Sequence, residues 1–210
     1  MSDAAVGKKA FLNGLFPETN WSELKPDDYK LVYQRLGKAG PLGAQAARYL
    51  QEKRTKIGFH KQYKSGAGWT LLKNITLTPG AKLSDPYTLC LISHEAFHLR
   101  QSVLMRLSVR GELIAWQYQK RAYRELTGKD IGAPGQAYRG TKEIWQKLSG
   151  FSANNREDLQ RAQKTMKAIS PDYRSDCLPL LPLTEEVGFC LRRWKIGEAA
   201  AAIWNLFTCK

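Results

Sequence analysis

The chain has 210 residues, of which 43% are hydrophobic, and this length is sufficient for one substantial core. Lysine and arginine number 33 against 19 acidic residues. The formal net charge of +14 favours anionic partners such as nucleic acid, an acidic membrane surface or an acidic peptide. The sequence contains no zinc finger, RNP motif or basic repeat, so no dedicated nucleic-acid motif supports the first of these.

The sequence also indicates a compartment. Residues 1–9 lack the apolar stretch of a signal peptide, and no apolar run reaches the length of a bilayer-spanning helix. The four cysteines are scattered without a C-x-x-C pair, and Cys90 falls beside an apolar helical stripe, as a reduced, partly buried thiol would. We therefore expect a cytoplasmic protein without a transmembrane segment, with secretion that needs no cleaved signal as the alternative.

Two helices and two strands are predicted in the N-terminal part of the chain. The helices cover residues 27–37 and 41–52, and the strands cover residues 55–62 and 69–78. In the second strand, apolar residues alternate with polar ones, as in a half-buried strand. Glycine and serine between residues 61 and 68 predict the turn that joins the two strands.

The next helix is the most informative element of the sequence. It begins at Asp85-Pro86, an N-cap residue followed by proline at the first helical position. His94, Glu95 and His98 project from the side opposite an apolar stripe, at about 100° per residue. One face of this helix is therefore expected in a core, and the other is left for chemistry. The residues of the apolar stripe are Leu89, Ile92, Ala96, Leu99 and Val103.

Residues 94–98 spell H-E-x-x-H. Histidines four positions apart lie about one turn apart on one helix face, so both imidazoles can bind the same zinc ion. Glu95 then lies beside the water that the metal activates and can act as general base. The alternative is a helix with two solvated histidines, which would not need Glu95 next to His94.

A catalytic zinc site needs a third protein ligand and an open fourth position. No histidine follows His98, and His60 lies in a different segment, so a carboxylate on the next predicted helix, residues 105–126, is expected. Glu112 arrives level with His98 if the first helix ends near residue 102, whereas Glu125 does so if that helix continues further. Glu112 is favoured because neighbours on its face would form a buried shell. These neighbours are Ala115, Trp116, Gln119 and Tyr123.

The sequence H-E-A-F-H at residues 94–98, followed by E-L-I-A-W at residues 112–116, resembles the gluzincin branch of zinc metallopeptidases, particularly its small bacterial members. The run H-L-R-Q at residues 98–101 is similar to an H-E-x-x-H-x-x-Q variant found in several uncharacterised zincin-like domains. The resemblance covers residues 53–127. The interval between the second histidine and the glutamate is shorter than in the large members of the family.

This resemblance implies that His94, His98 and Glu112 bind zinc, and that Glu95 is the general base of a metallopeptidase or amide hydrolase. It also implies an α+β, mostly helical fold, in which a small antiparallel or mixed sheet of two to four strands packs on the H-E-x-x-H helix and the following glutamate helix. In zincins an edge strand holds an extended peptide, and residues 74–78 are expected in that role here.

Beyond residue 127 the sequence predicts further helices and no motif. One of these helices opens at Asn154, with Glu157 three residues later. Prolines exclude regular helix or central strand from residues 176–183. In chain order, the expected elements are a linker over residues 128–140, helices over residues 141–148 and 154–169, the extended residues 176–183, and a helical stretch from Thr184 that is broken near Gly197.

We expect a single domain, residues 1–210, in which a helical extension, residues 128–210, packs on the catalytic core, residues 53–127. The favoured function is hydrolysis of a peptide or protein substrate. The alternatives are a non-catalytic basic module that binds nucleic acid or an acidic protein on a zincin scaffold, and a toxin or effector protease. Glu95 counts against the non-catalytic module, because a binding-only descendant would have little use for a general base.

Overall fold

The computed structural model describes residues 21–61, 67–69, 73–132, 142–169 and 175–208. The fold is α+β and mostly helical, with one four-stranded mixed sheet, which confirms the predicted class. The chain forms two compact units, each described here by itself. Unit 1 comprises Met1–Arg100 with Tyr118–Asp130, and unit 2 comprises Gln101–Gln117 with Ile131–Lys210.

Unit 1 contains the sheet, in the order β1 (Trp21–Glu23), β2 (Ile57–His60), β4 (Ile75–Leu77) and β3 (Ala67–Trp69). Strands β2 and β4 are parallel, and the two outer pairs, β1 with β2 and β3 with β4, are antiparallel. The predicted strand over residues 55–62 is therefore found in shortened form as β2. Strand β1 has no counterpart in the prediction.

Two predictions about the strand over residues 69–78 are wrong. Its ends belong to two different strands, β3 and β4, which pair with Trp69 opposite Ile75. Residues 74–78 are also not an edge, because β4 lies inside the sheet between β2 and β3. All three residues of β4 are buried, as expected of a strand with neighbours on both sides.

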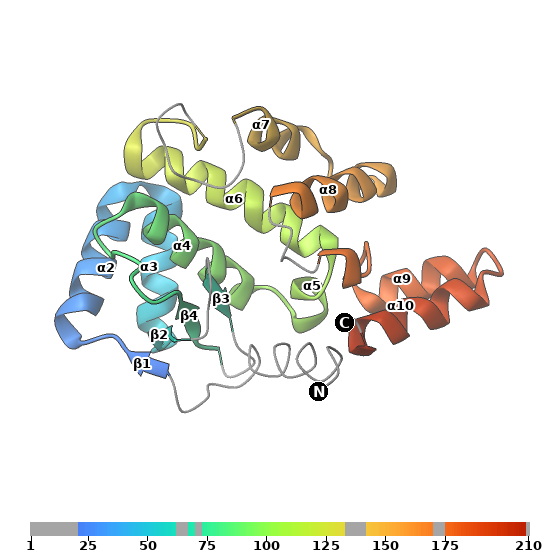
Figure 1. Ribbon diagram of the computed structural model, residues 1–210, viewed down its shortest axis with the longest axis horizontal. Coiled ribbons are helices and arrows are strands. Elements are labelled where there is room, and N and C mark those ends of the chain that lie inside the picture. Colours follow the sequence, from blue (N-terminus) through green and yellow to red (C-terminus); the bar gives the residue numbers. More distant parts are fainter. Residues whose placement is uncertain (1–20, 62–66, 70–72, 133–141, 170–174, 209–210) are drawn as a thin grey trace. The chain divides into compact units, whose positions relative to one another are not determined.

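Helices α2 (Pro26–Ala39), α3 (Pro41–Glu52) and α4 (Pro86–Arg100) accompany the sheet in unit 1 (Figure 1). Helix α4 packs against β3, β4 and α3, and α3 packs against α2. Four residues of the predicted stripe lie in this core, but Val103 is 44% exposed, because α4 ends at Arg100. The four core residues of the stripe are Leu89, Ile92, Ala96 and Leu99.

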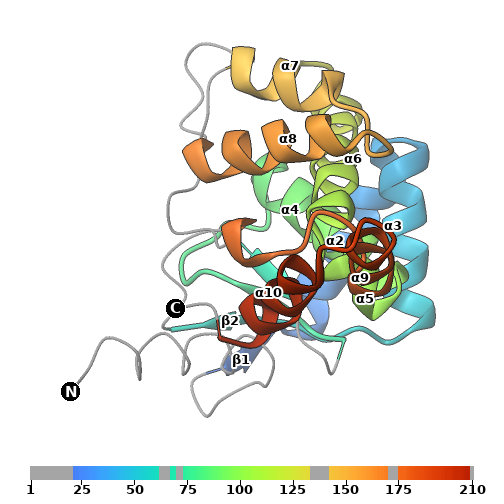
Figure 2. The ribbon, with the colours of Figure 1, turned by 90° about the vertical axis from the view of Figure 1, so that its right-hand side faces the viewer.

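Unit 2 is built of α5 (Val103–Arg106), α7 (Lys142–Gly150), α8 (Arg156–Ile169), the 3-10 turn η1 (Ser175–Cys177), α9 (Leu183–Leu191) and α10 (Ile196–Thr208). Helix α7 packs on α8, and α9 packs on α10 (Figure 2). The long helix α6 (Val109–Thr127) contributes its first half to unit 2 and its second half to unit 1. The division into units therefore falls within α6.

The C-terminal helices follow the prediction with two corrections. The side chain of Asn155, rather than Asn154, caps α8, because its Oδ1 accepts the backbone N–H groups of Glu157 (2.9 Å) and Asp158 (3.1 Å). The last helical stretch is broken over residues 192–195, between α9 and α10, whereas Gly197 lies inside α10. Of the expected linker, residues 133–140 lie outside the described residues.

Two further findings concern the apolar helices and the cysteines. Among the described residues, no helix combines the length and the apolar character that crossing a bilayer requires. Cys90 and Cys190 are free and buried, whereas Cys177 is disulfide-bonded.

Glu125, the rival candidate for the third ligand, has a structural role in unit 1. Its Oε2 atom accepts the backbone N–H groups of Leu42 (2.9 Å) and Gly43 (3.3 Å) in the first turn of α3. These N–H groups have no partner within their own helix, and the positive end of the helix dipole favours a carboxylate there.

We predict that Glu125→Ala lowers the free energy of unfolding by about 1 kcal/mol, because it removes the acceptor for the first turn of α3. Urea denaturation followed by circular dichroism measures this change. Glu52→Ala is the matched control, because Glu52 is exposed at the last position of α3 and should shift the midpoint little. Equal stability of the two variants would contradict the capping role.

Candidate metal centre

Helix α4 holds the two histidines of the H-E-x-x-H motif in a fixed relation. Its start is fixed by Asp85, whose Oδ1 accepts the N–H of Tyr87 at 3.1 Å, as the sequence predicts. The Nε2 atoms of His94 and His98 lie 3.0 Å apart, and both side chains are buried. Two imidazole nitrogens this close can share one proton in a hydrogen bond, or both can bind one cation. Only cation binding uses the lone pair of each nitrogen.

Glu112, in the first turn of α6, completes the group. Its carboxylate and the ring nitrogens of His94 and His98 supply ligand atoms that all lie within 4.8 Å of one another, and all three residues are buried. A search of the described residues for groups of histidine, cysteine or acidic side chains that could hold a metal ion finds His94, His98 and Glu112. Two imidazoles and a carboxylate are a ligand set that zinc favours, so the residues present fit this ion.

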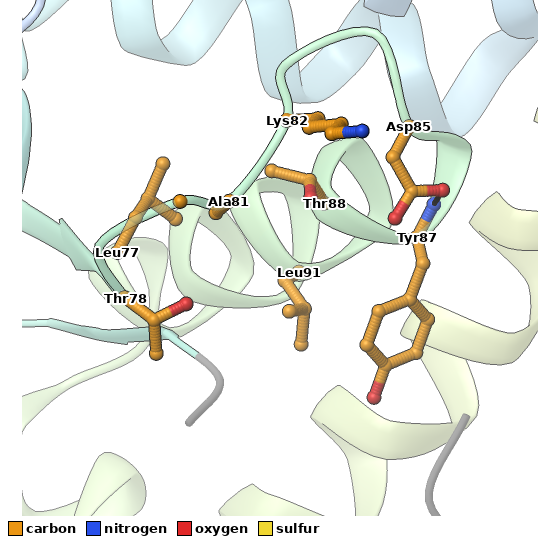
Figure 3. A pocket seen from close by; sticks show the side chains of 9 residues that line it. Leu77, Thr78, Ala81, Lys82, Asp85, Tyr87, Thr88 and Leu91 are labelled. Carbon is orange, nitrogen blue, oxygen red and sulfur yellow. Dashed lines mark hydrogen bonds between the residues drawn. The ribbon is translucent and has the colours of Figure 1, made fainter. Parts of the chain in front are cut away.

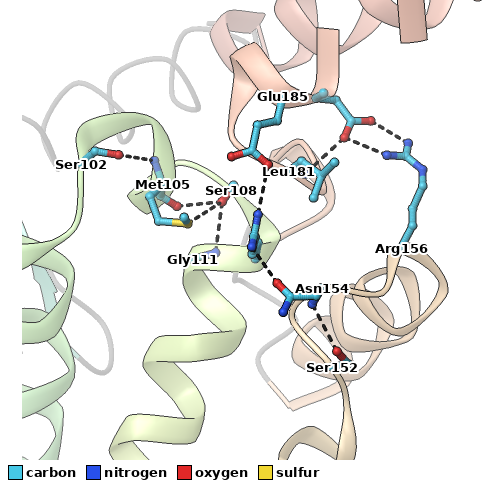
Figure 4. Close-up of polar contacts among 11 residues, drawn as sticks. Ser102, Met105, Ser108, Gly111, Ser152, Asn154, Arg156, Leu181 and Glu185 are labelled. Atoms are coloured by element: carbon cyan, nitrogen blue, oxygen red, sulfur yellow. Dashed lines mark hydrogen bonds and ion pairs between the residues drawn. The ribbon is translucent and has the colours of Figure 1, made fainter. Parts of the chain in front are cut away.

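The turn between α4 and α6 determines where Glu112 lies (Figure 4). Ser108 caps α6, because its hydroxyl accepts the N–H of Gly111 (3.0 Å) and donates to the carbonyl of Met105 (2.7 Å). Gln101 donates from Nε2 to the carbonyl of Gly111 at 3.2 Å. Thus the glutamine of the H-E-x-x-H-x-x-Q pattern binds the residue directly before Glu112.

Gly111 permits this tight turn. A Cβ atom at this position would overlap the carbonyl oxygen of Met105 and lie 2.7 Å from its carbonyl carbon. Because both atoms belong to the backbone, no side-chain rotation can relieve the overlap. Gly111 and Ser108 were not among the predicted site residues; the missed signal is a serine directly before the first residue of a helix.

The first turn of α6 is further held by the proline-rich segment of unit 2. The N–H groups of Val109 and Arg110 donate to the carbonyls of Pro179 (2.9 Å) and Leu180 (3.0 Å). The guanidinium of Arg110 also donates to Glu185 at 3.0 Å (Figure 4). The expected extended segment therefore supplies acceptors for N–H groups that a helix start leaves without an intrahelical partner.

The second half of α6 is anchored in unit 1. The ring of Tyr118 stacks on Phe97 of α4, with 4.7 Å between ring centroids, and its hydroxyl donates to the carbonyl of Leu42 at 2.7 Å. Burial raises the pKa of this phenol to about 12, so Tyr118 stays a neutral donor at ordinary pH. About two turns before Phe97 on α4, Cys90 accepts at its sulfur a hydrogen bond from Gln119 at 3.7 Å.

Three of the four neighbours expected around Glu112 are buried on α6, namely Ala115, Gln119 and Tyr123. The fourth, Trp116, is only half-buried and stacks on Trp145 of unit 2, with 5.0 Å between ring centroids. Glu95, the expected general base, is buried beside His94 on α4. His60 pairs with Trp21 in the sheet and is not a member of the metal-binding group.

A pocket of about 330 Å³ lies along α4 before the histidines (Figure 3). Tyr87 and Leu91 of α4 line it together with Leu77 at the end of β4, and Lys82 and Asp85 lie on the connecting loop. Leu91 is four residues before Glu95, which places the pocket about one helical turn from the motif on the same side of α4. This pocket has no signal in the sequence, because the loop residues that line it show neither the apolar spacing of a helix nor the alternation of a strand.

The comparisons give no family to which the chain can be assigned. It matches no family model, and no curated protein or solved structure is significantly similar to it. The interpretation of the centre therefore depends on its residues alone.

We predict that Gly111→Ala lowers the free energy of unfolding by about 1–3 kcal/mol, because the added methyl group forces the turn before Glu112 to shift. Urea denaturation tests this. The control is Gly37→Ala in α2, where an added Cβ meets nothing within 4 Å and alanine favours the helix. A Gly111→Ala variant as stable as Gly37→Ala would contradict the steric role.

A second prediction concerns the metal. We expect the purified protein to carry near-stoichiometric zinc, and Glu112→Ala to weaken zinc binding by at least about tenfold, because it removes one of three ligands. Glu125→Ala should keep its zinc, since this carboxylate caps α3. Mass spectrometry with inductively coupled plasma measures the content. Zinc lost only from the Glu125 variant, or from neither, would overturn the choice of Glu112.

Proposed function

We propose that the protein is a zinc-dependent metallopeptidase or amide hydrolase. The observation that carries this proposal is the convergence of His94, His98 and Glu112, with the remaining glutamate of the motif, Glu95, buried next to the first histidine. Two histidines and a carboxylate occupy three positions around a tetrahedral ion and leave a fourth for water or substrate. A purely structural site would fill all four positions with side chains.

When bound, zinc would polarise the scissile carbonyl and lower the pKa of water towards about 7. In this proposal the Glu95 carboxylate accepts the proton of the attacking water and later donates it to the leaving amine. His94 and His98 stay neutral, since each uses a ring nitrogen as ligand. Gln101, bound to the carbonyl of Gly111, keeps the first turn of α6 in the register that presents Glu112.

The surroundings of the centre support an extended peptide as substrate. Strand β3 is an edge of the sheet and packs against α4, so a peptide strand could add to its open side by backbone hydrogen bonds. This assigns to β3 the role that the sequence analysis gave to residues 74–78. The pocket beside Leu91 has an apolar wall, with Lys82 and Asp85 at its loop, which suits a substrate side chain that is largely apolar.

We predict that Glu95→Gln retains zinc and loses about 10²–10⁴-fold in hydrolysis, because the amide keeps the size of the side chain but cannot accept the proton. Fluorescein-labelled casein, with zinc supplied in the buffer, serves as the probe. His98→Ala is the companion variant and should lose both zinc and hydrolysis. Undiminished turnover in Glu95→Gln would falsify the assignment of the general base.

A further inference from the structure

The hairpin of α9 and α10 in unit 2 exposes an unusual amount of apolar surface. Of eight large hydrophobic side chains exposed among the described residues, five lie between residues 191 and 204. The largest are Trp194, Trp204 and Ile196, exposed by 88%, 68% and 64%. The other two are Leu191 and Ile203. Figure 1 shows α9 and α10 running side by side, and the turn between them carries Trp194.

Most of the described residues of α10 are exposed, and several of these exposed residues are apolar. Ile196, Ala200 and Ile203 follow one another at four- and three-residue steps and are exposed, whereas Ala199 is buried. The helix thus presents an apolar face away from the interior of unit 2. Large apolar faces exposed in this way are typical of surfaces that bind a partner or a membrane.

Trp194 occupies a backbone position that normally favours glycine. The N–H of Lys195 donates to the carbonyl of Cys190 (2.9 Å), and the N–H of Trp194 donates to the carbonyl of Leu191 (3.0 Å). This pair of bonds is the Schellman closure of a helix, in which the left-handed residue is usually glycine. Trp194 adopts that conformation with φ of 57°. The side chain of Trp194 extends into solvent, so the folded state gains neither burial nor a favourable backbone conformation from tryptophan at this position.

Cations are interleaved with these apolar side chains. Arg192, Arg193 and Lys195 flank Trp194, and Glu198 is the single acidic residue between residues 191 and 204. Lys195 pairs with Glu198 at 2.6 Å, and the guanidinium of Arg193 lies 4.2 Å from the ring centroid of Phe189. The turn therefore keeps a positive charge next to an exposed indole ring.

We infer that the α9–α10 hairpin is a peripheral membrane-binding surface that recognises an anionic lipid bilayer. Indole rings favour the boundary between headgroups and acyl chains, and neighbouring Arg and Lys residues are attracted to anionic headgroups. The aliphatic side chains of Leu191, Ile196 and Ile203 gain free energy in hydrocarbon, whereas bases of nucleic acid would stack only on the aromatic rings. The absence of a bilayer-spanning helix among the described residues agrees with attachment at the surface.

Two variants test the surface without disturbing the fold. Trp194→Gly removes the indole and places glycine where the left-handed backbone favours it, so its thermal melting temperature should not fall. Arg192→Gln removes a charge whose side chain makes no ion pair or hydrogen bond with the described residues. The matched control is Leu31→Ser, which removes an exposed apolar side chain from α2 of unit 1.

The probe is a vesicle of phosphatidylcholine with about 30 mol% phosphatidylserine, compared with phosphatidylcholine alone in a co-sedimentation assay. We expect the wild type to bind the anionic vesicles and Trp194→Gly to bind about tenfold more weakly. Arg192→Gln should be weakened less and show a smaller dependence on salt, and Leu31→Ser should bind as the wild type. Brominated phosphatidylcholine in the vesicles should quench more tryptophan emission in the wild type than in Trp194→Gly.

Other occupants of the surface give different results. Equal vesicle binding by the wild type and Trp194→Gly, or no binding by either, would overturn the inference. Binding to a labelled oligonucleotide that is lost in Trp194→Gly, without vesicle binding, would assign the surface to nucleic acid. A dimer in sedimentation equilibrium that dissociates in the same variant, again without vesicle binding, would assign it to a second copy of the chain. The inference does not depend on the metal centre, and zinc content should be the same in all three variants.

Discussion

The candidate metal centre depends on one mechanical constraint, the continuity of helix α6. Its second half is fixed by Tyr118, which stacks on Phe97 and binds the carbonyl of Leu42. Its first half is fixed by Ser108 and by the carbonyls of the proline-rich segment. Because a helix has a defined rise and rotation per residue, anchors at both ends determine the direction in which Glu112 projects.

Burial of the centre has an energetic consequence that favours a bound cation. His94, His98, Glu95 and Glu112 are all buried, and removing ionisable groups from water is costly unless charge and hydrogen bonds compensate. A divalent ion would neutralise the carboxylate of Glu112 and use the lone pairs of both imidazoles. Metal binding and folding are therefore expected to be coupled, so that zinc stabilises the arrangement that binds it.

The sequence predicted the elements whose signals are local. The cap at Asp85 and the spacing of the motif histidines are such signals, and α3 begins and ends at the predicted residues. Glu112 could be favoured over Glu125 from the neighbours on its helix face, which were expected to be buried, and three of these four are buried. Long-range partners gave no signal: Glu125 caps a helix that starts more than eighty residues earlier, and the hairpin of β3 and β4 alternates like one strand. Gly197 misled the prediction because the left-handed turn is made by Trp194.

The environment of Cys90 shows how the fold separates a competing ligand from the centre. Cys90 precedes His94 by one turn of α4, and a thiolate so close would be a strong zinc ligand. Its sulfur instead accepts a hydrogen bond from Gln119, and it is not among the residues that converge on Glu112. Burial raises the pKa of this thiol, which keeps it protonated, and only the thiolate binds metal. The same burial limits its oxidation, so that a free thiol on α4 and a disulfide at Cys177 can coexist in one chain. The fold thus affects the candidate ligand set in two ways. It brings His94, His98 and Glu112 together, and it keeps the thiol of Cys90 protonated and outside the group.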